Sequence, residues 1–238
     1  GLGSATSTVK VLEWDVAGFF SPLSGTYWTF NGNGNWDLAS NWSSPVPNGA
    51  SAAVRFGGGS TNITVNPSIT IDGTKTLGTI SFNHPSSSFA LVSGSGGILS
   101  LGSGGTASLV SVMDGSHSIN VPLFLNAGGV EFNVSGTDDT LSLGSIFGGT
   151  GSITKSGAGV LALTQASSRT ISQNLTITGG LLRQDGAGTL TLAGTNNLAS
   201  GGLAAANGVV RRGSAQAFTD GMAMVTSGSG RIDLNGYD

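Results

Sequence analysis

The twelve residues ITKSGAGVLALT (153–164) alternate apolar and small or polar side chains and contain a single charged residue, Lys155. A similar stretch, LRQDGAGTLTLA (182–193), follows and repeats both the G-A-G turn and the L-x-L pair. A period of two bounded by glycines is typical of a short β-strand with one buried face. We therefore assign to the core of repeated strands Ile153, Leu161, Leu163, Leu182, Leu190 and Leu192.

The same alternation recurs along the chain, for example in STNITVNPSITIDG (60–73) and VEFNVSG (130–136). Short strands at roughly ten-residue spacing, with no sustained helical period, predict an all-β protein. The internal repeat, the Gly/Ser/Asn-rich turns and the recurring Leu, Ile and Val favour a parallel β-solenoid. An antiparallel β-sandwich is the alternative. Rungs of roughly twenty residues predict about eight or nine rungs, a stack roughly 40 Å long.

Composition narrows the classes of function. The 238 residues include 41 Gly and no Cys, 9% are charged, and the net charge is −3. The longest basic cluster is Arg211-Arg212, so nucleic-acid binding is disfavoured. There is no apolar run long enough to predict a membrane span. Because the chain lacks Cys, it has no disulfides or thiolate metal sites, and we expect neither metal nor cofactor.

The first sixty residues differ in character and contain all four Trp. We divide the chain into an N-terminal strand or arm (1–25), a Trp-rich cap (26–60) and β-solenoid repeats with an open C-terminal end (61–238). The end of a solenoid exposes apolar side chains and unpaired strand edges, which bulky aromatic residues would cover. The alternative is a glycan-binding site formed by Tyr27, Trp28, Trp36 and Trp42, because aromatic rings stack on sugars.

One further pattern resembles a known family. GTGSITKSGAGVLALTQASS (149–168) is similar to the autotransporter-associated β-strand repeat of bacteria, G-x-L-T-K-x-G-x-G-x-L-x-L. The matching residues are Gly151, Ile153, Thr154, Lys155, Gly157, Gly159, Leu161 and Leu163. The segment 26–60 resembles the head that precedes such repeats, through Trp28, Trp36, Asn41 and Trp42. The resemblance, over roughly 26–238, implies a right-handed parallel β-helix from a secreted or surface-exposed protein, in which such repeats extend a stalk and some members adhere.

Candidates for catalysis are few, and we expect no enzyme. Asp138-Asp139 is the best local pair of carboxylates, but adjacent residues point to opposite faces of a strand or lie in a turn. His84 and His117 are interpreted as loop histidines without partners, and the alternative is a two-His metal site. The alternative class is a carbohydrate-active enzyme of β-helix type, which would need two carboxylates in one cleft.

The two ends of the chain suggest a mode of assembly. STVKVLEWDV (7–16) has the pattern of a strand, with Val9, Val11, Leu12 and Trp14 as its apolar residues. RIDLNGYD (231–238) resembles an incomplete rung, and 200–225 departs from the repeat and could hold an irregular turn. We therefore expect self-association, in which this strand completes the last rung of another copy in a head-to-tail filament. The alternatives are a strand that covers its own cap, or neighbouring repeats of a longer stalk. The expected location is extracellular or at the bacterial cell surface, where glycans are candidate partners.

Overall fold

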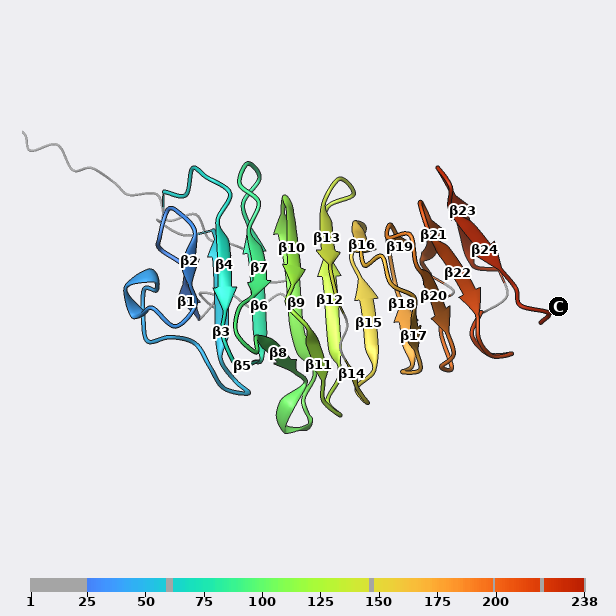
Figure 1. Ribbon diagram of the computed structural model, residues 1–238, viewed down its shortest axis with the longest axis horizontal. Coiled ribbons are helices and arrows are strands. Elements are labelled where there is room, and N and C mark those ends of the chain that lie inside the picture. The colour runs from blue at the N-terminus through green and yellow to red at the C-terminus, as the bar shows by residue number, and fades with distance from the viewer. Residues whose placement is uncertain (1–24, 59–61, 146–147, 199, 219–220, 238) are drawn as a thin grey trace, which may run out of the picture.

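The protein is a parallel β-solenoid. The computed structural model describes residues 25–58, 62–145, 148–198, 200–218 and 221–237. The candidate donor strand with Val9, Val11, Leu12 and Trp14 lies outside these residues. In the described chain, parallel strands stack in about 8 turns (Figure 1). The prediction of an all-β solenoid is confirmed, and the antiparallel β-sandwich is not supported.

Two long sheets form most of the stack, and the nine-stranded sheet continues beyond the end of the seven-stranded one. The seven-stranded sheet contains, in order, β1 (Thr26–Tyr27), β3 (Ala53–Gly57), β6 (Thr79–Asn83), β9 (Ser108–Asp114), β12 (Val130–Val134), β15 (Ile153–Ser156) and β18 (Leu175–Ile177). The nine-stranded sheet contains β2 (Gly34–Asn35), β4 (Ser68–Ile71), β7 (Ala90–Ser93), β10 (Ser116–Asn120), β13 (Thr140–Leu143), β16 (Val160–Leu163), β19 (Leu181–Gln184), β21 (Gly202–Ala205) and β23 (Ala223–Thr226).

Two four-stranded sheets complete the turns. The first contains β5 (Thr74–Leu77), β8 (Ile98–Leu101), β11 (Leu123–Leu125) and β14 (Gly148–Gly149). The second contains β17 (Arg169–Ile171), β20 (Thr189–Leu192), β22 (Val209–Arg212) and β24 (Arg231–Asp233). Two short 3₁₀ helices, η1 (Ala39–Asn41) and η2 (Ser103–Gly105), lie in the connecting loops.

The strand register places like residues above one another. In the nine-stranded sheet, Leu141, Leu161, Leu182 and Leu203 occupy successive strands at the same position, 20 or 21 residues apart. All four side chains are buried. This spacing agrees with the rung of roughly twenty residues expected from the sequence, so each turn covers the apolar residues of the turn before it.

The two quoted stretches do not stack on each other. Val160–Leu163 forms β16 in the nine-stranded sheet, whereas Thr189–Leu192 forms β20 in the second four-stranded sheet. Strand β16 pairs with β19 instead, with Leu161 opposite Leu182. All six core residues assigned from these stretches are buried. Alternation therefore identifies a strand and its buried face, but not the sheet to which the strand belongs.

Glycine permits the close approach of successive turns. Gly157 has a φ of +73°, and a Cβ there would lie 2.2 Å from the Val134 carbonyl oxygen of the preceding turn. A side chain would therefore be both strained and in collision. Glycines at such corners explain much of the glycine content of the chain.

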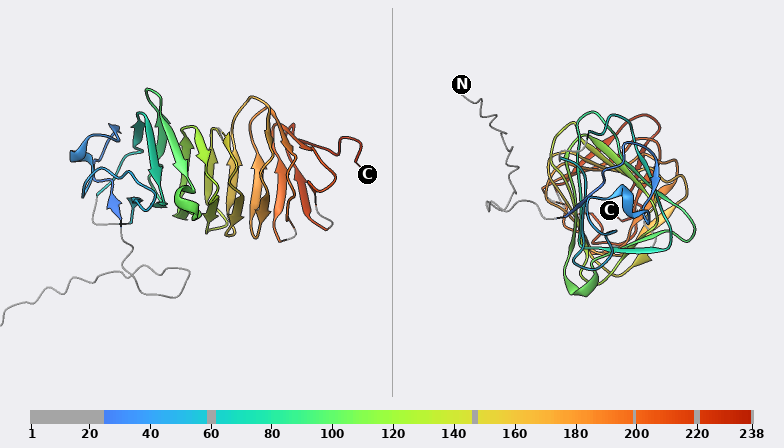
Figure 2. Two further views of the ribbon diagram at one scale, coloured as in Figure 1. Left: turned by 90° about the horizontal axis from the view of Figure 1, so that it is seen from below. Right: turned by 90° about the vertical axis from the view of Figure 1, so that its left-hand side faces the viewer.

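Two segments singled out in the sequence take part in the stack. The Ala-rich segment is regular, because β21 and β22 pair with the turn before and the turn after. Its Ala204 and Ala205 are buried, so 202–212 consists of regular strands. The range 200–225 also includes the connection from β22 to β23, whose described residues, 213–218 and 221–222, form no strand. The Trp-rich segment contributes β1 and β2 to the two long sheets, so it forms the first turn of the stack. Figure 2 shows this turn, in blue, lying across one end of the solenoid.

Candidate functional site

The indoles of the first turn form the end of the core. Trp28, Trp36 and Trp42 are 0%, 0% and 6% exposed. Trp42 packs edge-on against Trp28 and Trp36, at centroid distances of 5.1 and 4.7 Å. Trp36 and Trp42 also lie 6.2 and 6.0 Å from Phe56 of β3. These three indoles therefore offer no accessible ring face on which a sugar could stack.

Hydrogen bonds fix the orientation of these rings. The indole N–H groups of Trp28, Trp36 and Trp42 donate to the carbonyl oxygens of Phe30, Pro47 and Trp36, at 2.7, 3.0 and 2.6 Å. A buried indole N–H needs such a partner. The fourth candidate, Tyr27, is partly exposed.

Tyr27 forms a cation–π contact with a neighbouring arginine. The Arg55 guanidinium lies 5.1 Å from the centre of its ring and donates to its hydroxyl at 2.9 Å. The four aromatic residues proposed as a glycan site thus lie in one turn, where the three indoles are buried and Tyr27 is partly exposed.

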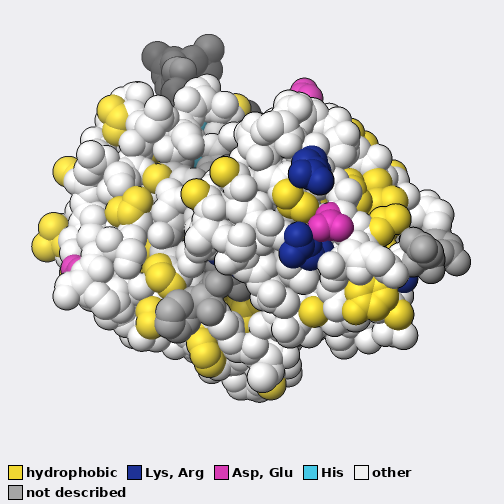
Figure 3. Space-filling model, turned by 45° about the vertical axis from the view of Figure 1, so that its right-hand side comes forward, with side chains coloured by type: hydrophobic (Ala, Val, Ile, Leu, Met, Phe, Trp, Pro, Cys, Tyr) yellow, Lys and Arg dark blue, Asp and Glu magenta, His cyan; other side chains and the backbone are white. Residues whose placement is uncertain are grey.

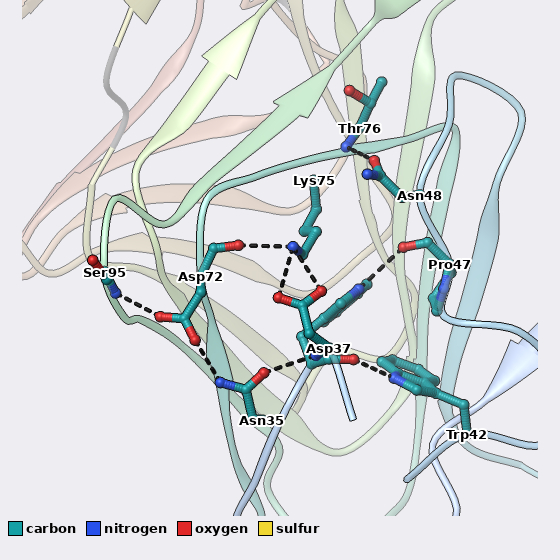
Figure 4. Close-up of polar contacts among 10 residues, drawn as sticks. Asn35, Asp37, Trp42, Pro47, Asn48, Asp72, Lys75, Thr76 and Ser95 are labelled. Carbon is teal, nitrogen blue, oxygen red and sulfur yellow. Dashed lines mark hydrogen bonds and ion pairs between the residues drawn. The ribbon is translucent and has the colours of Figure 1, made fainter. Parts of the chain in front are cut away.

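A polar network joins this first turn to the turns behind it (Figure 4). The buried Lys75 ammonium donates to the Asp37 carboxylate, with N–O distances of 2.8 and 3.0 Å, and to the Asp72 carbonyl oxygen at 2.7 Å. The Asp72 carboxylate accepts from the Asn35 amide at 2.5 Å and the Ser95 N–H at 2.6 Å. Chiefly through the Asn35 bond, these contacts lower the pKa of Asp72. The network therefore connects three successive turns.

A polar groove on the side of the stack contains the candidate catalytic residues. Its volume is about 420 Å³, and it is lined by Asn66, His84, Pro85, Ser86, Ser87, Ser88, Asp114, Gly115, Ser116, Asp138 and Asp139. The structure thus brings Asp138, Asp139 and His84 together with Asp114, which the sequence did not single out as a partner. The corner loops of adjacent turns supply these residues.

Several of these side chains hold the loops. The Asp139 carboxylate accepts from the N–H groups of Gly115 at 2.9 Å and Gly136 at 3.2 Å. His84 Nδ1 accepts from the Ser87 N–H at 2.9 Å, and its Nε2 lies 3.1 Å from the Ile63 carbonyl oxygen. Asp139 and His84 therefore have structural partners at both polar atoms, which disfavours them as a catalytic pair.

His117 lies in the core and not in a loop, contrary to expectation. It belongs to β10, is 2% exposed, and stacks on Phe82 at 4.9 Å. Its Nδ1 accepts from the Phe89 N–H at 3.1 Å, and its Nε2 is 3.0 Å from the Asp114 carbonyl oxygen. Because a carbonyl only accepts, Nε2 carries the proton and the ring is neutral. Burial lowers the pKa of His117 below 6.5.

Lys155, the charged residue of the opening stretch, also points inward. It is 0% exposed and occupies a column between Phe132 and Ile177 of the neighbouring turns. Its ammonium donates to the carbonyl oxygens of Ser156, Gly157 and Gly179, at 2.6, 2.9 and 3.2 Å. Three N–H donors thus meet three acceptors from two successive turns. Burial nevertheless lowers the pKa of Lys155 from 10.5 to about 8.

The last turn exposes apolar side chains at positions that are buried in the preceding turns. Leu182 and Leu203 are 2% and 1% exposed, whereas Met224, the next residue in their column, is 47% exposed. Val225 and Leu234 are also exposed, at 50% and 44%. Among the described strands, β23 pairs with β21 alone, and β24 pairs with β22 alone. This end therefore has both apolar side chains and strand edges without a partner in the described chain.

Other kinds of site were sought in the same residues. Within the described ranges, there is no group of three or more His, Cys, Asp or Glu placed to hold a metal ion. No helix in that part of the chain is long and apolar enough to cross a membrane. Comparisons of the chain with protein-family models, curated protein sequences and solved structures find no match. The resemblance to the autotransporter-associated repeat therefore stays a prediction that rests on the quoted residues.

Proposed function

We propose that this protein is a non-catalytic structural module of an extracellular β-solenoid stalk or head-to-tail surface filament. The observation that carries the proposal is that the two ends of the solenoid differ in how well they are covered. The first turn is covered by packed indoles, whereas within the described residues nothing covers Met224 or the outer edges of β23 and β24. In an all-parallel stack, a further strand extends the sheets in the same direction. A contact between unlike ends does not close, so it produces a filament.

The use of polar groups supports a structural role. Lys75, Lys155 and His117 are directed into the stack and satisfy backbone or carboxylate groups. Asp139 binds the N–H groups of two turns. Residues that commonly act in catalysis are thus engaged in holding successive turns together. Such a stack is suited to carrying adhesive segments away from a cell surface, which is the extracellular role that we assign to it.

The test is direct observation of assembly. The purified 238-residue chain is examined by negative-stain electron microscopy and sedimentation velocity over a range of concentrations. We expect particles that lengthen along one axis as the concentration rises. A chain that stays monomeric at every concentration would contradict the filament.

The lateral groove favours one second candidate, a carbohydrate-active enzyme, because it gathers three carboxylates, those of Asp114, Asp138 and Asp139. The discriminating assay is the release of reducing ends from a panel of polysaccharides. We expect no release above that of heat-inactivated protein. Release that disappears in Asp138→Asn but persists in the matched surface variant Asp185→Asn would identify an enzyme.

A further inference from the structure

The corner that connects β6 to β7, residues 84–89, is held to the stack by imidazole nitrogens. His84 Nδ1 accepts from the Ser87 N–H at 2.9 Å and from the Ser86 N–H at 3.3 Å. Its Nε2 lies 3.1 Å from the Ile63 carbonyl oxygen, so Nε2 carries the proton and the ring is neutral. His84 therefore serves this corner as a hydrogen-bond acceptor.

The second of the two histidines in the chain serves the same corner from the next turn. The Phe89 N–H donates to Nδ1 of the neutral His117 ring at 3.1 Å. The remaining N–H, that of Ser88, donates to the Asn66 amide oxygen at 2.8 Å. Three of the four N–H groups that follow Pro85 in this corner therefore depend on an imidazole nitrogen.

A second proton on either ring is incompatible with these bonds. An imidazolium has an N–H at both nitrogens and accepts no hydrogen bond. The Phe89 N–H would then face another N–H in the core, where Phe89 and His117 are 0% and 2% exposed. A buried donor without an acceptor is costly. Protonation of the histidines and the closed corner therefore oppose each other.

The surroundings favour the protonated rings once the corner has moved. Few charged side chains show on the face drawn in Figure 3, but the lateral groove beside the corner is lined by the three carboxylates of Asp114, Asp138 and Asp139. Burial is the main cause of the lowered pKa of His117, and the charge of His84 lowers this pKa further, whereas the charges of Asp139 and Asp114 raise it. Opening removes the burial and leaves the carboxylates, so His117 binds its second proton more tightly in the open corner.

We propose that the corner 84–89 is an acid-sensitive switch, in which protonation of His84 and His117 releases residues 85–89 from the stack and opens the lateral groove. The groove widens because Ser86, Ser87 and Ser88 form part of its lining. Strand β7 stays in place, since it pairs with β4 and β10. Each turn of a solenoid contacts only its neighbours, so a corner can open without unfolding the stack. The switch acts on the side of the stack and does not depend on the proposed filament.

Hydrogen exchange followed by NMR tests the switch on the ¹⁵N-labelled 238-residue chain at pH 7, 6, 5 and 4. Protection of each N–H is expressed relative to an unfolded peptide at the same pH, and the ring ¹⁵N shifts report protonation of the histidines. A pKa that rises by one unit on opening changes the open fraction by about tenfold. We therefore expect the protection of the Ser87 and Phe89 N–H groups to fall about tenfold or more as the rings become protonated. The control is the Gly159 N–H, which donates to the Val134 carbonyl oxygen at 2.9 Å and should keep its protection.

A matched double variant, His84→Asn with His117→Asn, retains an acceptor oxygen near each Nδ1 position and does not titrate. Its protection at Ser87 and Phe89 should not depend on pH. Protection that falls in the double variant as it does in the wild type would overturn the switch. So would, in the wild type alone, rings that stay neutral at pH 4, or rings that become protonated while Ser87 and Phe89 stay protected. An equal fall at Gly159 would show unfolding of the stack and would overturn the local opening.

Discussion

The buried Lys155 makes a quantitative prediction about stability and pH. Its pKa is about 8 in the folded chain and 10.5 in the reference state. Between these values the unfolded chain binds one more proton than the folded chain, so raising the pH favours folding. Below pH 8 both states are protonated, and the cost of burying the charge is present in full. From pH 7, the free energy of unfolding should therefore rise by about 1 kcal/mol at pH 9 and by about 2–3 kcal/mol at pH 10.

The assay compares the wild-type chain with Lys155→Met, which has a similar length and no titrating group. Unfolding by urea is measured at pH 7, 8, 9 and 10, and the difference between the two proteins is plotted against pH. The difference is used because Lys155→Met also leaves the carbonyl groups of Ser156, Gly157 and Gly179 without their donor. That loss shifts the curve vertically, whereas the titration of Lys155 gives it a slope.

The slope of this difference against pH tests the reasoning. We expect the stability of the wild type relative to Lys155→Met to increase steadily above pH 8. Parallel curves would show that three carbonyl oxygens stabilise the ammonium as well as water does. The reasoning that burial dominates at Lys155 would then be wrong.

Three further predictions concern the core and the corners. Trp36→Ala should cost about 3–5 kcal/mol in urea unfolding, and the exposed control Leu38→Ala less than about 0.5 kcal/mol. Gly157→Ala should destabilise by about 1–3 kcal/mol more than Gly73→Ala, because both have positive φ but only a Cβ at 157 meets backbone; equal costs would contradict this. Because the pKa of His117 is lowered by burial, stability should fall as the pH drops below 6.5, and His117→Gln should remove that part of the fall in acid denaturation curves.

Much of the fold could be predicted from local pattern, because a strand with one buried face must alternate. The core residues Leu161, Leu182 and Leu190 illustrate both the success and its limit. All three were placed in the core, but the two G-A-G copies led to the alignment of Leu161 with Leu190, whereas Leu161 stacks on Leu182. Which strands stack depends on the number of residues that complete a full turn, and the corners that determine this number are irregular.

The roles of the inward-facing polar residues were harder to predict from the sequence. Lys155 occupies an alternating position that apolar residues fill in neighbouring turns, and this position was the available signal of burial. Its acceptors include the Gly179 carbonyl, which lies 24 residues away in sequence and comes close only when the turns stack. His117 likewise depends on Phe89, a partner 28 residues away. Local pattern contains no information on such distant partners, so these roles required the structure.

The direction of the hydrogen bonds has a mechanical consequence. The strands lie across the long axis of the stack, so the hydrogen bonds between turns run along that axis (Figure 1). A pull on the two ends of the stack therefore places the same force on every junction between turns. The junction with the weakest hydrogen bonds therefore opens first, while the other turns stay folded. Each turn of about 21 residues releases about 70 Å of chain in place of about 4.8 Å of stack. Under tension such a stack lengthens in steps and absorbs work at each step.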